Sequence, residues 1–392
     1  MPCVYWYMRH IFLYALGFIL SSLIPALGQG SFSDLLKKVD SSQLSEKESL
    51  VQEFVEQQNS FPIINEDQVI FLVKGDESEA AALLGDFNSF MNRRYVTDQQ
   101  LAAMTNIKGT SWHYTTKEFR SDAIVNYKYW INEEAVLDPL NSKQRSNFGE
   151  AVSFFTMPDY DSKQEFKPKE GVAKGEVRQE KFQSEALNHE RIIHVYLPPG
   201  HSDLDNLPLV FFHDGSFHVN EMRVPDIIDQ LIARNAMEPV VVVFDDPVIR
   251  GKEYQGDSDY RLYVSNELIP YIETKYNTSK KERAVFGFSR GGMSALYLSH
   301  NTDIFSKVGA FSPAIHPLSV EDFSAELESF GNRPEEIFIT ASLYDHIWYP
   351  DAPKLRETFI SNKVVVHYKE IPMGHNIPSW QTVVDDILDK FY

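Results

Sequence analysis

The chain has 392 residues, which at about 100–200 residues per domain is enough for two domains. Hydrophobic residues make up 43% and charged residues 24%, a composition typical of globular proteins that excludes long disordered tracts and fibrous repeats. The 56 Asp and Glu residues against 37 Lys and Arg give a formal net charge of −19, so the surface repels nucleic acid and has no general attraction to anionic membranes.

Residues 1–28 have the pattern of a secretory signal. Arg9 precedes an apolar run over residues 11–27, and the small residues Ala26 and Gly28 stand where a signal peptidase cleaves. The pattern predicts an exported, periplasmic or extracellular protein without stable membrane insertion after cleavage. An uncleaved anchor is the alternative, because about 17 apolar residues are the short limit for spanning a bilayer. The only cysteine, Cys3, lies in this segment, which excludes an intramolecular disulfide and a multi-thiolate zinc site.

The sequence of residues 29–183 predicts three successive parts. Residues 29–64 are polar and rich in good helix formers, and they predict a helical lead-in. Residues 65–160 hold many short strand candidates separated by turn signals, which predicts a small all-β sandwich. Residues 161–183 are rich in Lys, Glu, Gln and Gly and poor in apolar residues, so they predict a linker or an exposed strand connection.

Residues 184–392 show a different pattern, in which apolar strand candidates alternate with helical ones. The strands are expected at 192–197, 207–212, 240–244, 284–286, 337–341 and 364–370. The helices are expected over 224–234, 260–276, 293–299 and the C-terminus. This alternation predicts an α/β fold with a mostly parallel sheet covered by helices on both faces.

One motif in this part carries chemistry. Residues 287–291 read G-x-S-x-G, directly after a predicted strand and directly before a predicted helix. A nucleophilic serine must sit on a turn so tight that flanking side chains would clash, which is why glycines surround it. The helix that follows points its N-terminal amides at developing negative charge. We therefore expect Ser289 to be a nucleophile.

A nucleophilic serine needs a base, and the base needs a group that orients it. In this arrangement the acid and then the histidine follow the serine along the chain. His375 follows the last predicted strand, in a loop that begins at Pro372, and is the predicted base. Asp345 follows the strand at 337–341 and is the predicted acid, with Asp351 as the alternative.

The negative charge formed on the substrate needs amide donors. One is expected from Arg290, just after the nucleophile, and the other from Ser216 or Phe217, with Phe217 preferred, in the loop after the strand at 207–212. There is no H-E-x-x-H, no glycine-rich phosphate loop and no dinucleotide fingerprint, so no metal and no cofactor are expected.

The order and spacing of further blocks resemble the enterochelin-esterase-like branch of the α/β-hydrolases, also called the esterase D family. The matching blocks are 191–200, 213–215, 250–254, 266–270, 287–292 and 311–313, followed by Asp345 and residues 374–375. Residues 85–88 (Gly-Asp-Phe-Asn) and 138–141 (Asp-Pro-Leu-Asn) are similar to the early-set, immunoglobulin-like module that precedes the hydrolase domain in such enzymes. The resemblance covers about residues 65–392, with residues 65–160 as the module and 184–392 as the esterase domain.

The resemblance implies hydrolysis of carboxylic esters on small molecules or polysaccharides: siderophore trilactones, or the acetyl and feruloyl esters of plant walls. The charge of −19 is a poor match for an anionic siderophore unless a local basic site offsets it. Arg250, Arg290 and Lys252 are candidates for such a site, although Arg250 can instead form a structural ion pair with Glu253. Trp348 is a candidate for stacking on a sugar or phenolic ring, and His346 for shaping the pocket.

Other functions fit the same pattern. One alternative is a catalytically weak carbohydrate-binding protein on this fold, in which the N-terminal sandwich contacts a glycan. A second is an acyltransferase, which would hand the acyl group to an alcohol other than water. A peptidase of related fold is disfavoured, because the N-terminal module is too short for the propeller that gates such enzymes.

Overall fold

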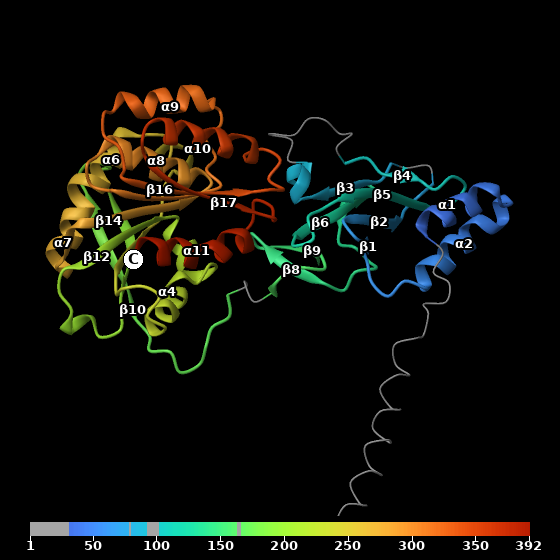
Figure 1. The fold of residues 1–392 in the computed structure, drawn as a ribbon, viewed down its shortest axis with the longest axis horizontal. Helices are drawn as coiled ribbons and strands as arrows, with labels where there is room; N and C mark the ends of the chain where they lie inside the picture. The colour runs from blue at the N-terminus through green and yellow to red at the C-terminus, as the bar shows by residue number, and fades with distance from the viewer. Residues whose placement is uncertain (1–30, 78–79, 92–101, 163–165) are drawn as a thin grey trace, which may run out of the picture.

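The computed structural model describes residues 31–392 except 78–79, 92–101 and 163–165, and Figure 1 shows two bodies side by side. The predicted signal segment therefore lies outside the described residues. Among the helices that are described, none combines the length and the apolar character needed to cross a membrane.

The N-terminal body begins with two helices that pack on a sheet. These are α1 (Phe32–Ser41) and α2 (Leu44–Glu56), and the sheet has the order β1 (Ile63–Asn65), β2 (Gln68–Lys74), β5 (Trp112–Glu118) and β4 (Thr105–Asn106). The five central residues of strand β2, Val69–Val73, are apolar because they are buried on both faces. Ile70 and Leu72 face the helices with Val51, whereas Val69, Phe71 and Val73 face the second sheet.

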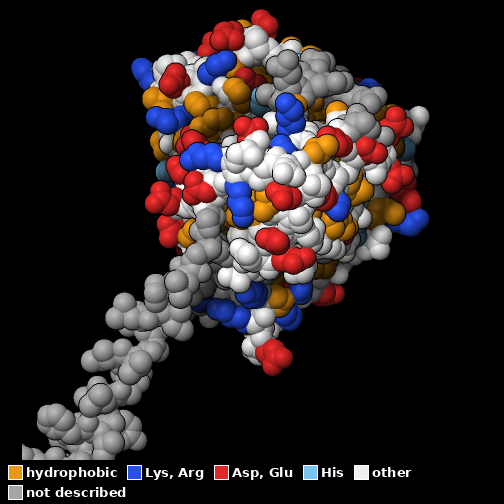
Figure 2. All heavy atoms as spheres, turned by 90° about the vertical axis from the view of Figure 1, so that its right-hand side faces the viewer, with side chains coloured by type: hydrophobic (Ala, Val, Ile, Leu, Met, Phe, Trp, Pro, Cys, Tyr) orange, Lys and Arg blue, Asp and Glu red, His pale blue; other side chains and the backbone are white. Residues whose placement is uncertain are grey.

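The second sheet of this body is also antiparallel. Its order is β3 (Ala82–Gly85), β6 (Ile124–Ile131), β9 (Glu150–Thr156) and β8 (Gln144–Asn147), with β7 (Glu134–Val136) paired to β6. Aromatic side chains fill the space between the two sheets, and Phe71 packs edge-on against both Tyr127 and Phe155. In Figure 2 acidic and basic side chains are interspersed over the far end of this body, with hydrophobic atoms scattered between them.

The C-terminal body is built on an eight-stranded sheet. The order is β10 (Glu176–Ser184), β11 (His189–Leu197), β13 (Val241–Asp245), β12 (Leu207–His213), β14 (Thr278–Phe288), β15 (Lys307–Phe311), β16 (Glu336–Ser342) and β17 (Val365–Ile371). The first two pairings are antiparallel and the others are parallel. The predicted linker at 161–183 extends too far, because residues 176–183 belong to β10. Every second residue of this edge strand is exposed, which gives it the composition of a linker.

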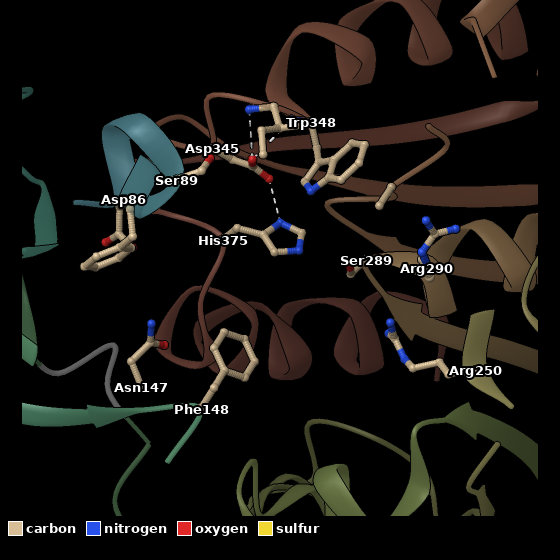
Figure 3. A pocket seen from close by; sticks show the side chains of 13 residues that line it. Asp86, Ser89, Asn147, Phe148, Arg250, Ser289, Arg290, Asp345, Trp348 and His375 are labelled. Carbon is tan, nitrogen blue, oxygen red and sulfur yellow. Dashed lines mark hydrogen bonds and ion pairs between the residues drawn. The ribbon is translucent and has the colours of Figure 1, made fainter. Parts of the chain in front are cut away.

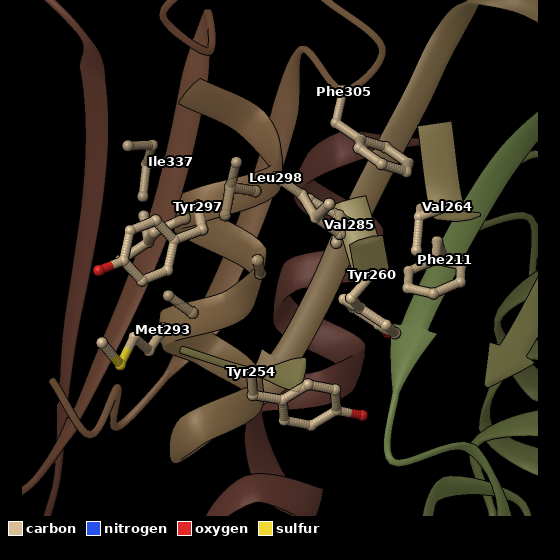
Figure 4. Close-up of a cluster of buried hydrophobic side chains, with 14 of the residues drawn as sticks. Phe211, Tyr254, Tyr260, Val264, Val285, Met293, Tyr297, Leu298, Phe305 and Ile337 are labelled. Carbon is tan, nitrogen blue, oxygen red and sulfur yellow. The ribbon is translucent and has the colours of Figure 1, made fainter. Parts of the chain in front are cut away.

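Helices cover both faces of this sheet, as the alternating pattern predicts. On one face lie α4 (Val224–Ala233) and α11 (Ile377–Phe391). The other face is covered by α6 (Ser258–Leu262), the π-helical turn Tyr263–Leu268, α7 (Ile269–Tyr276), α8 (Arg290–Asn301), α9 (Val320–Ser329) and α10 (Ala352–Ser361). Figure 4 shows part of this second core, where Tyr254, Tyr260 and Phe211 surround Val285 of the central strand. Two short helices, α3 (Gly215–Asn220) and α5 (Arg250–Glu253), follow β12 and β13.

A buried ion pair ties the sheet to helix α5. Arg191 of β11 is 1% exposed and donates to Asp245 Oδ2 at 2.5 Å and to Glu253 Oε2 at 2.8 Å. Burial raises the pKa of Asp245 to about 6, while Arg191 opposes that rise. The other oxygen of Glu253 accepts the amides of Val248 and Ile249, so this network fixes the loop that leads into Arg250.

Replacing Arg191 by Met should destabilise the protein by about 3–5 kcal/mol, because two buried carboxylates lose their partner. Arg178→Met is the matched control, since its ion pair with Glu176 lies on the surface and is worth about 1 kcal/mol or less. Urea unfolding of both variants measures the difference. Equal unfolding midpoints would contradict the role given to Arg191.

Candidate active site

Ser289 stands at a strained turn between β14 and α8. Its backbone has φ 55° and ψ −123°, a conformation that L-residues avoid and that costs about 1–3 kcal/mol. Three backbone hydrogen bonds hold it: its amide donates to the carbonyl of Phe311, and its own carbonyl accepts the amides of Met293 and Ala314. The strain is therefore balanced by contacts to the neighbouring strand and to α8.

The glycines of the motif are needed because side chains at their positions would clash at this turn. A Cβ on Gly287 would lie 2.3 Å from the backbone of Gly291, and one on Gly291 would lie 3.0 Å from Asp214 Oδ2. Strand β14 and helix α8 can approach this closely only because Gly287 has no side chain, while Gly291 leaves room for Asp214.

His375 and Asp345 come together from two different loops beside Ser289. His375 Nδ1 lies 2.6 Å from Asp345 Oδ2, and the other oxygen of Asp345 accepts the amides of Ile347 and Trp348. Asp345 is 1% exposed, so these hydrogen bonds replace the water that a buried carboxylate loses. In Figure 3 the second ring nitrogen of His375 faces Ser289. The alternative acid, Asp351, lies instead at the start of α10.

A pocket of about 440 Å³ opens at these residues. From the C-terminal body it is lined by Arg250, Ser289, Arg290, Ala314, Asp345, Ile347, Trp348 and His375. From the N-terminal body it is lined by Asp86, Ser89, Phe90, Asn147 and Phe148. Both bodies therefore build its wall (Figure 3).

Phe148 is the aromatic part of the N-terminal wall. It lies at the tip of the β8–β9 hairpin and is 51% exposed. Its ring stacks on Phe217, with centroids 6.1 Å apart, and packs edge-on against Trp380, whose indole also meets His375. Phe148, Phe217 and Trp380 give an adjoining hollow, which also contains Ser289 and His375, an aromatic surface. Nothing in the local sequence marks Phe148, because an exposed Phe at a hairpin tip is an ordinary surface residue.

The predicted amide donors differ in whether another group of the protein already accepts their hydrogen bond. The amide of Ser216 donates to Asp246 Oδ1 at 2.9 Å, so it is engaged within the protein. Phe217 lies in the first turn of α3, where amides lack helical partners, and its ring borders a hollow that also contains Ser289 and His375. Arg290 opens α8 and lines the main pocket.

Three predicted substrate contacts have distinct outcomes. Trp348 lines the pocket, although it is only 8% exposed. His346 is exposed and does not line it, so it does not shape the pocket wall. Arg250 lines the pocket but pairs with Asp214 rather than with Glu253. The predicted pairing with Glu253 is wrong because that carboxylate is already taken by Arg191.

Sequence reasoning missed the part played by Asp86. This carboxylate of the N-terminal body is fully buried, and its Oδ2 accepts the amide of Asn126 at 2.8 Å and Nδ2 of Asn376 at 3.0 Å. Burial raises its pKa to about 6. Asn376 is the neighbour of His375. The Gly-Asp-Phe-Asn block drew attention to Asp86, but a partner 290 residues away leaves no local pattern.

The sheet order and the turn at Ser289 define the C-terminal body as an α/β-hydrolase. Residues 184–383 match the family model described as "Putative esterase", so the chain belongs to the putative esterase family. Within the described ranges, no three or more His, Cys, Asp or Glu side chains are grouped so that they could hold a metal ion.

Solved structures of similar fold include two enterobactin esterases. The ferric enterobactin esterase of Salmonella typhimurium matches with a TM-score of 0.67 and 18% identity, over 86% of this chain and 98% of that one. The enterobactin esterase of Shigella flexneri matches with a TM-score of 0.64 and 19% identity, over 87% of this chain and 97% of that one. At these identities the likeness shows a common fold, and its coverage includes much of the N-terminal body.

Curated relatives match over shorter stretches. The ferri-bacillibactin esterase BesA of Bacillus subtilis is 32% identical over 95 residues, which is 23% of this chain and 33% of that protein. The uncharacterized protein YjcH of the same organism is 25% identical over 131 residues, which is 31% of this chain and 55% of that protein. The matched stretches thus span about a third and about half of these relatives.

Asp86→Asn should change how stability depends on pH. A native pKa raised from 3.8 to about 6 means that the folded chain binds this proton more tightly than the unfolded chain. The wild type therefore loses stability as the pH rises from about 4 to above 6, by up to about 3 kcal/mol, and Asn avoids that loss.

Urea unfolding at pH 4, 6 and 8 measures this difference. The variant should gain over wild type at pH 8 and lose most of that gain at pH 4. Asp40→Asn, an exposed position on α1, is the control and should show no such trend. A constant difference between Asp86→Asn and wild type across the three pH values would contradict the buried-carboxylate assignment.

Proposed function

We propose that the chain is an exported serine ester hydrolase in which Ser289, His375 and Asp345 form a catalytic triad. The observation that carries the proposal is the hydrogen bond between His375 Nδ1 and Asp345 Oδ2, made beside a serine on a strained strand-to-helix turn. That bond fixes the imidazole with Nε2 free to accept a proton, which is what a general base requires.

The reaction proceeds in two steps through an acyl-enzyme. His375 Nε2 takes the proton of Ser289 as Oγ attacks the ester carbonyl, and the proton then passes to the leaving alcohol. Asp345 stabilises the imidazolium that forms between these events. The amides of Arg290 and Phe217 are the proposed donors to the tetrahedral oxyanion, since the amide of Ser216 is engaged by Asp246. Water repeats the sequence on the acyl-enzyme.

The substrate class follows from the two-body pocket. Phe148 lines it, and Phe148, Phe217 and Trp380 together line an adjoining hollow at Ser289 and His375, whose aromatic surface suits a phenolic or sugar ring. We therefore propose a carbohydrate-linked acetyl or feruloyl ester or a siderophore-type ester as substrate. The likeness in fold to the enterobactin esterases supports the siderophore-type ester.

Two further parts of the proposal concern the chain outside the site. The signal pattern of residues 1–28 supports export to the periplasm or beyond. The two antiparallel sheets of residues 65–160 support an early-set, immunoglobulin-like module. A glycan contact by that module stays a prediction.

Ser289→Ala should lower the rate by about 10⁴–10⁶-fold, because the nucleophile is lost while the fold is kept. A panel of acetyl-xylan, methyl ferulate and a catecholate trilactone, with p-nitrophenyl acetate as a generic ester, measures activity and ranks the substrate classes. Ser361→Ala, an exposed serine on α10, is the control and should match wild type. Substantial activity remaining in Ser289→Ala would sink the nucleophile assignment.

A further inference from the structure

Two arginines line the pocket, and one of them is neutralised. Arg250 donates from Nε to Asp214 Oδ1 at 2.7 Å and from Nη2 to Asp214 Oδ2 at 2.8 Å. This is the two-pronged geometry in which guanidinium and carboxylate fit best. The charge of Arg250 is thereby balanced within the protein, and its guanidinium also lies over the rings of Tyr254 and Phe288.

Arg290 is in a different electrostatic position. Its Nη1 is buried without a hydrogen-bond partner, and no described residue forms an ion pair with its guanidinium. The carboxylates that line the pocket are already engaged, Asp345 by His375 and Asp86 by Asn376. A partly desolvated cation without a counter-charge is costly, and an anion entering the pocket removes that cost.

Arg290 lines the same pocket as Ser289, whose hydroxyl is the proposed nucleophile. In Figure 3 both arginines lie on the side of Ser289 away from His375. A group bound at Arg290 would therefore lie in the pocket that also contains Ser289.

We propose that Arg290 forms an anion subsite that selects esters carrying a carboxylate or a similar planar anion close to the scissile bond. The inference rests on the proposed ester hydrolysis and specifies its substrate class. The planar guanidinium presents paired N–H donors that match two oxygens of such a group. The net charge of −19 acts against an anionic substrate at a distance, whereas the subsite acts within the pocket, where salt screens less.

Two matched pairs of esters test the subsite. The first is 4-acetoxybenzoate with neutral 4-acetoxybenzamide, and the second is p-nitrophenyl hydrogen suberate with p-nitrophenyl octanoate. For each pair the measured quantity is the ratio of kcat/KM for the anionic ester to that for the neutral one. Arg290→Met should lower this ratio by about tenfold or more in at least one pair, and Arg290→Glu should lower it further.

Arg178→Met is the matched control, because it removes a positive charge that pairs with Glu176 on the surface and lies outside the pocket lining. Its ratios should equal those of wild type. Unchanged ratios in both Arg290 variants would overturn the subsite and leave the triad intact. Activity retained in Ser289→Ala would instead overturn the proposed function, so the two failures are distinguishable.

An independent set of contacts joins the N-terminal body to the loop that carries His375. Asp86 Oδ2 accepts Nδ2 of Asn376, and Asn376 Oδ1 accepts the amide of Ser379 at the start of α11. Both Asp86 and Asn376 are buried. A Cβ on Gly374 would lie 2.2 Å from Asp86 Cγ, so the loop approaches Asp86 as closely as its backbone allows. His375 is held between these two contact points.

The same body also holds the loop of Asp345. The amide of Arg120 donates to the hydroxyl of Tyr344 at 2.9 Å, and the Tyr344 ring packs edge-on against Phe119. The amide of Tyr344 in turn donates to the carbonyl of Met373 in the histidine loop. The loops of the acid and the base thus share one support, which lies outside the hydrolase sheet.

The geometry points to Asp86 as a positioning residue that acts through Asn376 to set the place of His375. An error of about 1 Å in the place of a catalytic group costs on the order of 100-fold in rate. Asp86→Ala removes both hydrogen bonds and should lower kcat by about that factor with little change in KM. Asp86→Asn keeps an oxygen acceptor at the same point and should restore most of kcat.

Val51→Ala is the control for simple destabilisation, since it opens the helix-side core of the same body far from the pocket. Circular dichroism fixes a temperature at which every variant is folded, and kcat and KM are measured there. Loss of kcat in Asp86→Ala, with rescue by Asn and normal kcat in Val51→Ala, supports positioning. A kcat near wild type in Asp86→Ala, or the same loss in Val51→Ala, would overturn it.

Discussion

The close approach of β14 and α8 is the constraint on which the rest of the site depends. With only 2.3 Å between a Cβ on Gly287 and the backbone of Gly291, the chain must turn through a residue of positive φ, and that residue is Ser289. Such a conformation persists only when its surroundings hold it. Here the carbonyl of Phe311 and the amide of Ala314 hold it from the side of β15, so the sheet itself sets the place of the serine oxygen.

The other groups of the site are brought to that fixed point by loops with less support of their own. Asp345 and His375 follow neighbouring parallel strands, β16 and β17, so both emerge at the edge of the sheet where β14 ends. Their loops also meet the N-terminal body, through Tyr344 on one side and Gly374 and Asn376 on the other. The N-terminal body is therefore a structural part of the pocket as well as a separate fold.

Charge acts on two length scales in this protein. The net charge of −19 produces a repulsive field for anions, but salt screens that field beyond about 8–10 Å. Inside the pocket the balance is set by individual pairs, and there Arg250 is neutralised by Asp214 while Arg290 is not paired with any described residue. Global acidity and a local preference for an anion are therefore compatible, because they operate at different distances from the scissile bond.

The sequence by itself determined the features that depend on local pattern and on chain order. Alternating apolar strands and helices indicated a covered, mostly parallel sheet, and the glycines around Ser289 indicated its turn. The order of serine, acid and histidine then indicated His375 and Asp345, with Asp351 as the alternative acid, and the structure brings His375 and Asp345 into hydrogen-bond contact. These inferences succeed because a buried strand must be apolar and a tight turn must lack side chains wherever it occurs.

Only the tertiary structure decided which distant residues meet. The partner of Arg250 proved to be Asp214, 36 residues away, rather than the neighbouring Glu253, and Asp86 met Asn376 across 290 residues. The sequence of strand β10 predicts a linker because seven of its nine residues are polar, although the strand pairs with β11 at the edge of the sheet. The physical reason is common to all three. A hydrogen bond or ion pair between remote segments constrains their relative position in space but imposes no periodicity on the sequence around either partner.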